Sequence, residues 1–377
     1  MYFRCFQVRL IMATLLMTVV VTKGAMAVES EAPVRIIANR DAKQPQIAVD
    51  ASGRIFIAFG QGNRISIAIS TDGGKTFEVN SVGSAGALSL GMRRGPRVAV
   101  TPEAVVITAI GGKNGKGQDG DVLAWRSTDK GKTWAGPTRV NRVESSAREG
   151  LHAMVSGPNG ILFCTWLDLR NKRTEIYGSL SKDAGTTWEA DTLIYRSPDR
   201  SVCECCHPSA AFSPDGSLKV MWRNQLKGVR DMYFASSTDG GKTFGEAEKL
   251  GQGTWQLRAC PMDGGAIAVG PEGQVETIWM RSGSMFSAKP GKPEEPLGRG
   301  VQGWAAFGAG GLYRVWLESR PGKLLALSPE SLGTITLAQG VTDPVIASNP
   351  KGNGPVVVAW ESMDGGILAL VLNPAGR

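Results

Sequence analysis

The chain has 377 residues, a formal net charge of +8, and 49 glycines. This charge is mildly basic, and no dense run of Lys and Arg interleaved with aromatic residues occurs, so we do not expect nucleic-acid binding. Abundant glycine with few long helical patterns predicts an all-β protein of many short strands and turns.

Residues 1–27 have the pattern of a secretory signal peptide. Arg4 and Arg9 precede an apolar stretch, and Ala25-Met26-Ala27 supplies small residues for cleavage. We expect cleavage after Ala27, which leaves residues 28–377 as one periplasmic or secreted domain. An uncleaved N-terminal anchor is the alternative, although the apolar stretch is short for a membrane span. No later segment is apolar enough to cross a bilayer. Cleavage lowers the net charge to +5, because the segment holds three basic residues and no acidic one.

Pairs of short apolar strands follow along the rest of the chain. In chain order the pairs are 45–49 with 54–59, 96–100 with 105–110, 152–155 with 161–166, 208–212 with 218–222, 265–269 with 275–279, 303–307 with 312–316, and 344–347 with 356–360. Their alternation of apolar and small or polar residues fits sheets packed face to face. We interpret them as the first two strands of seven units; if one pair is an insertion, the number is six.

The last unit ends after a third strand, Ile367–Leu372. Its missing fourth strand could be the N-terminal segment Val34–Ala38, which would close a ring and leave no open sheet edge. The prediction is therefore a single β-propeller domain, seven-bladed with six blades as the alternative, closed by pairing of its N- and C-terminal strands.

An eight-residue pattern, Ser-x-Asp-x-Gly-x-Thr-aromatic, occurs four times at intervals of 57, 54 and 56 residues. Asp and Gly at these positions favour a tight turn. The pattern resembles the Asp-box, or BNR repeat, of the sialidase superfamily, in which it joins the third and fourth strands of a propeller blade. That resemblance implies a structural role for Asp72, Gly74, Asp129, Gly131, Asp183, Gly185, Asp239 and Gly241.

On this topology the remaining loops lie on the face opposite the Asp-boxes, and they are rich in arginine. The planar guanidinium fork suits carboxylates and phosphates, so we expect this face to bind an anionic carbohydrate or another small anionic molecule. The alternative is that these charged side chains are only solvated or form ion pairs with each other. The candidate substrate-binding residues are Arg94, Arg148, Arg170, Arg223, Arg230 and Arg258.

Catalysis is harder to assign from the sequence. A catalytic sialidase carries an Arg-Ile-Pro motif, an acidic Asp and a Tyr–Glu nucleophile pair; here Val34–Ile37 has Ile in place of Pro, and no tyrosine fits the pair. Sialic acid hydrolysis is therefore in doubt. Many glycosidases use two carboxylates, one donating a proton while the other polarises or attacks. Glu149 and Asp168 are the candidates, and such a reaction requires no cofactor.

A cysteine cluster is the most distinctive local feature. Cys203, Cys205, Cys206 and His207 are close in sequence, and Cys260 enters the next unit. In an oxidising compartment four cysteines can form two disulfides. The alternatives are a copper or zinc site formed by thiolates and imidazole, or a redox-active disulfide. We expect Cys164, within a strand, to be a core residue.

Two functional hypotheses result. The first is a secreted sialidase-like protein that processes or binds glycans, of the exo-α-sialidase type if it is an enzyme. The second is a non-catalytic periplasmic propeller that binds a protein partner or a metal through the Cys/His cluster. A propeller hosts many functions, so the fold alone does not choose between them.

Overall fold

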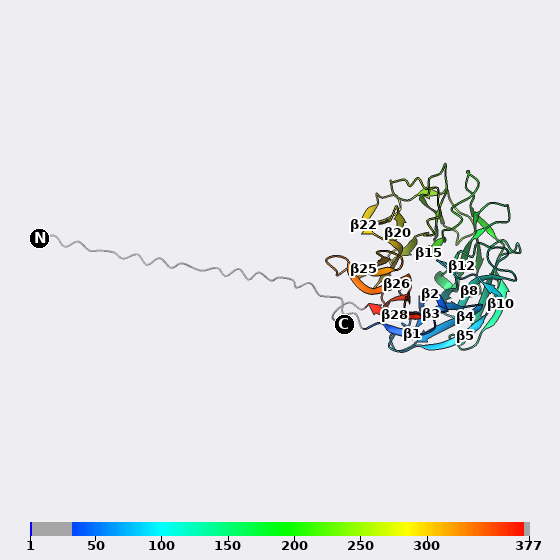
Figure 1. Cartoon of the computed structure of the whole chain (residues 1–377), viewed down its shortest axis with the longest axis horizontal. Helices are drawn as coiled ribbons and strands as arrows, with labels where there is room; N and C mark the ends of the chain where they lie inside the picture. The colour runs from blue at the N-terminus through cyan, green and yellow to red at the C-terminus, as the bar shows by residue number, and fades with distance from the viewer. Residues whose placement is uncertain (2–31, 373–377) are drawn as a thin grey trace.

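The computed structural model describes Met1 and residues 32–372, and the predicted signal peptide, apart from Met1, lies outside these residues. Within them the chain forms 28 β-strands and one 3₁₀ turn, Pro158–Gly160. The strands are arranged as small sheets around a common centre (Figure 1). No helix of the described part is long and apolar enough to cross a membrane.

Five antiparallel sheets follow each other along the chain. The first contains β2 (Ala42–Val49), β3 (Ile55–Gln61), β4 (Arg64–Ser70) and β5 (Glu78–Ser84). The second contains β6 (Ala87–Leu88), β7 (Arg97–Val100), β8 (Val105–Gly112), β9 (Asp121–Ser127) and β10 (Ala135–Arg139). The third contains β11 (His152–Ser156), β12 (Leu162–Asp168), β13 (Glu175–Ser181) and β14 (Thr192–Tyr195). The fourth contains β15 (Ser209–Phe212), β16 (Leu218–Arg223), β17 (Met232–Ser237) and β18 (Glu248–Lys249). The fifth contains β19 (Ala266–Val269), β20 (Val275–Arg281), β21 (Ser284–Ala288) and β22 (Glu295–Arg299).

The remaining strands form one longer sheet that includes both ends of the described chain. Its order is β1-β28-β27-β26-β25-β24-β23. The first part of the long strand β26, up to Val341, pairs with β25, and its second part, from Val341 on, pairs with β27, where the register shifts between Thr342 and Val345. The bounds are β1 (Val34–Ile37), β23 (Val301–Gly308), β24 (Gly311–Leu317), β25 (Gly322–Leu327), β26 (Ile335–Ala347), β27 (Val356–Ser362) and β28 (Ile367–Leu372). Val34 of β1 pairs with Ala369 of β28, which joins the two ends.

The innermost strands contact each other in sequence around the centre. β2, β7, β11, β15, β19, β23 and β26 each contact the next, and β26 contacts β2. Apolar clusters fill the spaces between neighbouring sheets: Trp166 packs between the second and third sheets, and Trp222 between the third and fourth. Burying a side chain such as Phe163 completely contributes roughly 1.5–3 kcal/mol. The architecture is that of a β-propeller, in which the core is divided among the sheet interfaces.

The four Asp-box turns lie between the last two strands of each of the first four sheets. In the first turn the Asp72 carboxylate accepts hydrogen bonds from the Ser70 hydroxyl at 2.8 Å, the Thr76 amide at 3.0 Å and the Thr76 hydroxyl at 2.6 Å. The same contacts recur in the other three turns. These hydrogen bonds hold the pKa of Asp72 well below its usual range.

Candidate functional site

The two faces of the disc differ in chemistry. A cavity of about 680 Å³ lies on the Asp-box face and is lined by turns between first and second strands. Its main acidic group, Asp50, is satisfied locally by the amides of Ser52 and Arg54. A channel of about 280 Å³ lined by the inner strands continues from this side. The cavity therefore has few polar groups that are free to bind a ligand. The clusters of titratable side chains, around Glu149 and the cysteines, lie on the opposite face.

Asp168, a predicted catalytic residue, is completely buried at the end of β12. One carboxylate oxygen accepts the Arg170 amide at 2.9 Å and its Nε at 2.8 Å. The other accepts the Trp166 indole at 2.7 Å and Arg170 Nη2 at 2.8 Å. Arg170 also pairs with Asp191 at 2.6 Å and stacks on the Tyr177 ring. Because both oxygens are occupied, this geometry gives Asp168 and Arg170 a structural role.

Glu149, the other predicted catalytic residue, differs from Asp168 in that its carboxylate is unpaired among the described residues. It is half-buried in the connection between β10 and β11, and its carboxylate accepts no hydrogen bond within the described chain. Burial raises the pKa of Glu149; Arg94 and Arg148 oppose this rise, and the nearby charge of Glu204 adds to it. A partly buried carboxyl with a raised pKa is a suitable proton donor. No pattern in the sequence indicates a role for Glu204, because it lies in a later connection between sheets and comes near Glu149 only in the folded chain.

The six candidate arginines do not form one site. Arg223 is buried, and carbonyl groups of Asp263, Arg230 and Met280 accept its hydrogen bonds, so it is structural like Arg170. Arg94 donates to the Glu149 carbonyl at 2.8 Å. The exposed Arg148 and Arg258 make no hydrogen bond or ion pair with the described residues. Arg230 contacts the sulfur of Cys203.

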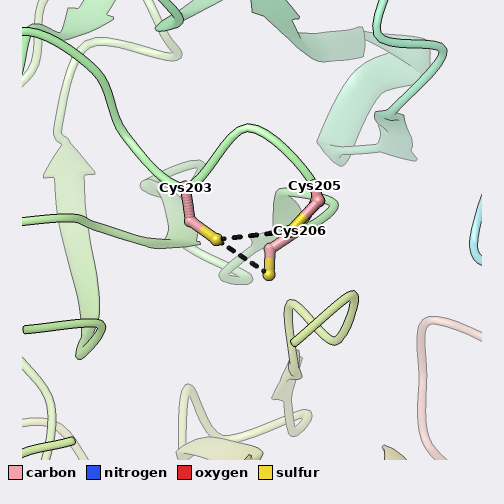
Figure 2. A group of neighbouring side chains, drawn as sticks. All are labelled: Cys203, Cys205 and Cys206. Atoms are coloured by element: carbon pink, nitrogen blue, oxygen red, sulfur yellow. Dashed lines mark hydrogen bonds between the residues drawn. The ribbon is translucent and has the colours of Figure 1, made fainter. Parts of the chain in front are cut away.

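Three of the cysteines lie together (Figure 2). The Cys203 sulfur is 3.7 Å from that of Cys205 and 3.2 Å from that of Cys206, and all three sulfurs lie within 4.8 Å of one another. No disulfide joins any cysteines in the described part of the chain. The predicted five-ligand set is not assembled, because Cys260 is exposed and neither it nor His207 joins the three sulfurs. Cys164 is buried in β12, as expected.

The three thiols differ in how readily they lose a proton. Hydrogen bonds with the other two thiols, and the positive charges of Arg230 and Arg223, lower the pKa of Cys203 to about 3. The hydrogen bond to Cys203 raises the pKa of Cys205 to about 12, and burial raises the pKa of Cys206. Arg230 Nη1 donates to the Cys203 sulfur at 3.0 Å. The group therefore holds its first negative charge on Cys203.

His207 belongs to the channel. Its ring is completely buried, is stacked on Trp304 with centroids 5.7 Å apart, and has no partner for either nitrogen. Burial, followed by the charges of Arg93 and Arg97, holds the pKa of His207 well below its ordinary value, so the ring is neutral. Arg93 lies over the same Trp304 ring and donates to the Pro344 carbonyl at 3.1 Å. Sequence reasoning missed this contact, because Arg93 and Pro344 are far apart in the chain.

The four Asp-box turns and the propeller fold define a class of protein, the BNR-repeat propellers. Residues 95–259 match the family model of the BNR repeat-like domain. This match agrees with the resemblance to sialidase-type repeats that the four Asp-boxes indicate. No protein with a curated description matches the sequence.

Solved structures with the same fold act on different glycans. An α-L-arabinanase from Penicillium chrysogenum, complexed with arabinobiose, is 13% identical with a TM-score of 0.54, over 92% of this chain and 98% of that one. An ulvan lyase is 13% identical with a TM-score of 0.57, over 90% and 96%. A Hadza microbial sialidase is 15% identical with a TM-score of 0.52, over 89% and 66%. At such low identity these similarities describe the fold.

Proposed function

We propose that this protein is a glycan-active enzyme whose site lies around Glu149, on the face opposite the Asp-boxes. The observation that carries the proposal is a half-buried carboxyl group that accepts no hydrogen bond from the described chain and whose pKa is raised. The arabinanase, the ulvan lyase and the sialidase with the same fold support a glycan as the substrate.

The residues around Glu149 suggest a division of roles. Glu149 donates its proton to the oxygen of the leaving sugar, and Glu204 accepts a proton from the water that attacks the anomeric carbon, so the glycosidic bond is hydrolysed. Arg94 and Arg148 bind an acidic group of the substrate, since their charges already act on the Glu149 carboxyl. Glu204 replaces Asp168 as the second carboxylate of the mechanism. Exo-α-sialidase activity is the narrower form of this proposal, with sialic acid as the anionic sugar.

We further infer that the scaffold is a seven-bladed ring. Seven inner strands contact each other in turn, and β26 provides the outer strand of one blade and the inner strand of the next. Pairing of β1 with β28 supports closure between the chain ends. We propose that residues 28–377 act as one domain in the periplasm or outside the cell. N-terminal sequencing of protein recovered from that compartment would reveal cleavage after Ala27.

The test of function uses a panel of anionic and neutral oligosaccharides and aryl glycosides, including a sialoside. Glu149→Gln should lower kcat/KM by at least about 100-fold, because general acid catalysis typically contributes that much. Glu144→Gln is the matched control, since Glu144 is exposed in the same connection, and its activity should be unchanged. Equal rates for the wild type and Glu149→Gln would contradict the proposal. Binding without turnover, weakened by Arg148→Gln, would restrict it to a glycan-binding protein.

A further inference from the structure

The proposed glycan site makes no use of the three clustered cysteines. We propose that Cys203, Cys205 and Cys206 form a binding site for one Cu(I) ion, coordinated by three thiolates. This proposal does not depend on the proposed glycan activity, because it concerns different side chains.

The sulfur positions fit ligands of a single ion. Thiolates bound at about 2.3 Å to one metal, at tetrahedral or trigonal angles, lie roughly 3.8–4.0 Å apart. The distances from the Cys203 sulfur are 3.7 Å and 3.2 Å, and all three sulfurs lie within 4.8 Å of one another. A small inward or outward adjustment of each side chain therefore completes the geometry. Figure 2 shows the sulfurs of Cys203 and Cys206 turned toward each other at the end of the turn.

The composition of the ligand set favours copper. Among the described residues, no histidine, aspartate or glutamate lies close enough to join the three cysteines. Soft thiolates suit both Cu(I) and zinc, but a structural zinc site is normally closed by four ligands, so a set of only three thiolates favours Cu(I). Every ligand that is still a thiol releases its proton to solvent as it binds, and copper enters and leaves as Cu(I), so the step requires no oxidant or reductant.

A neighbouring arginine balances the negative charge that the copper site would carry. A Cu(I) ion bound by three thiolates leaves a net negative charge, which is costly in a buried position. Arg230 Nη1 lies 3.0 Å from the Cys203 sulfur, and its Nε donates to the Leu257 carbonyl at 3.3 Å, so the guanidinium is fixed beside the ligands. Such outer contacts orient ligands and tune a metal site.

The turn that carries the ligands is anchored before any metal binds. The Cys203 amide donates to the Arg223 carbonyl at 3.0 Å, and the preceding Val202 amide donates to the Thr174 carbonyl at 3.0 Å. The Cys206 amide closes the turn on the Cys203 carbonyl at 3.4 Å. Cys203 and Cys206 are buried and Cys205 is partly exposed, so an ion can enter at Cys205.

The experiment uses the mature chain, reduced and kept without oxygen. It is titrated with Cu(I) in competition with a chromophoric Cu(I) chelator, and X-ray absorption records the ligands. We expect one copper per chain with three sulfur neighbours. Cys203→Ser and Cys206→Ser should each weaken binding at least 100-fold. Cys205→Ser, which changes a partly exposed side chain, should do the same without affecting the fold. Cys164→Ser and Cys260→Ser are the matched controls and should bind copper like the wild type.

Several results would overturn the proposal. The first is binding that survives all three serine substitutions in the cluster. The second is a zinc ion held in preference to copper with Cys260 as a fourth ligand, which Cys260→Ser would release. The third is a Cys203–Cys206 disulfide that, once reduced, still yields thiols with no affinity for Cu(I). Circular dichroism spectra of each variant, identical to that of the wild type, ensure that lost binding reflects lost ligands.

Discussion

Gly74, in the first Asp-box, lies directly against Val371 of the strand β28 in the adjacent sheet. A β-carbon placed on Gly74 would lie 2.5 Å from the Val371 Cγ2 atom. The equivalent glycines of the other three turns face side chains of the preceding sheet in the same way: Gly131 faces Ile69, Gly185 faces Val106, and Gly241 faces Phe163. The Asp-box is therefore a contact between sheets as well as a turn within one sheet.

This contact predicts a difference between two neighbouring glycines. Gly73 and Gly74 both have positive φ, +78° and +92°, but nothing lies within 4 Å of a β-carbon on Gly73. Gly73→Ala should cost about 1–2 kcal/mol from backbone strain. Gly74→Ala should cost roughly a further 1–3 kcal/mol from overpacking. Denaturant unfolding of both variants tests this, and equal destabilisation would show that the contact with Val371 is unimportant.

The structural role of Asp168 makes a second prediction. Asp168→Asn removes one of the two carboxylates that pair with the partly buried Arg170 and leaves Asp191 as the other, so it should reduce the free energy of unfolding by about 1–3 kcal/mol. Glu144→Gln removes a carboxylate whose side chain is 74% exposed, and should change stability by less than about 1 kcal/mol. Chemical denaturation measures both values. A stable Asp168→Asn protein that lost only its activity would instead restore Asp168 as a catalytic candidate.

The pH dependence of activity tests Glu149. Its proton donor form is lost as pH rises through its raised pKa, so kcat/KM should fall on that side. Glu204 raises this pKa by repulsion and Arg148 lowers it by attraction. Removing the cation with Arg148→Gln should therefore move the fall in activity to higher pH. Glu204→Gln should move the fall to lower pH in whatever activity remains. A profile that neither substitution moves would mean that another group is titrating.

The Asp-box carboxylates predict how stability depends on acid. The pKa of Asp129 is lowered in the fold by hydrogen bonds from the Thr133 hydroxyl and amide and from the Ser127 hydroxyl. A lowered folded-state pKa contributes stability that is present above the unfolded pKa of about 3.9 and is lost as pH falls below it. The stability difference between wild type and Asp129→Asn should therefore shrink as the pH falls from about 5 to 2. A constant difference in thermal melts across this range would contradict the prediction.

The sequence alone was enough to predict an all-β fold built on BNR-type repeats. The reason is that an Asp-box is a local structure: Ser70, Asp72 and Thr76 satisfy one another within one turn, so the pattern can be recognised without knowing its neighbours. The alternating strand pairs are equally local. The sequence also suggested Glu149 and the cysteines as candidates, because unusual residues were concentrated in connections between strand pairs.

The tertiary structure decided which of these residues meet. Sequence spacing placed Cys260 and His207 with the other cysteines, but His207 turns its ring onto Trp304 in the channel, and Cys260 is exposed. Proximity of Glu149 to Glu204 arises between consecutive connections of the ring. Side-chain direction at the ends of inner strands depends on packing between blades, and no local pattern in the sequence encodes it.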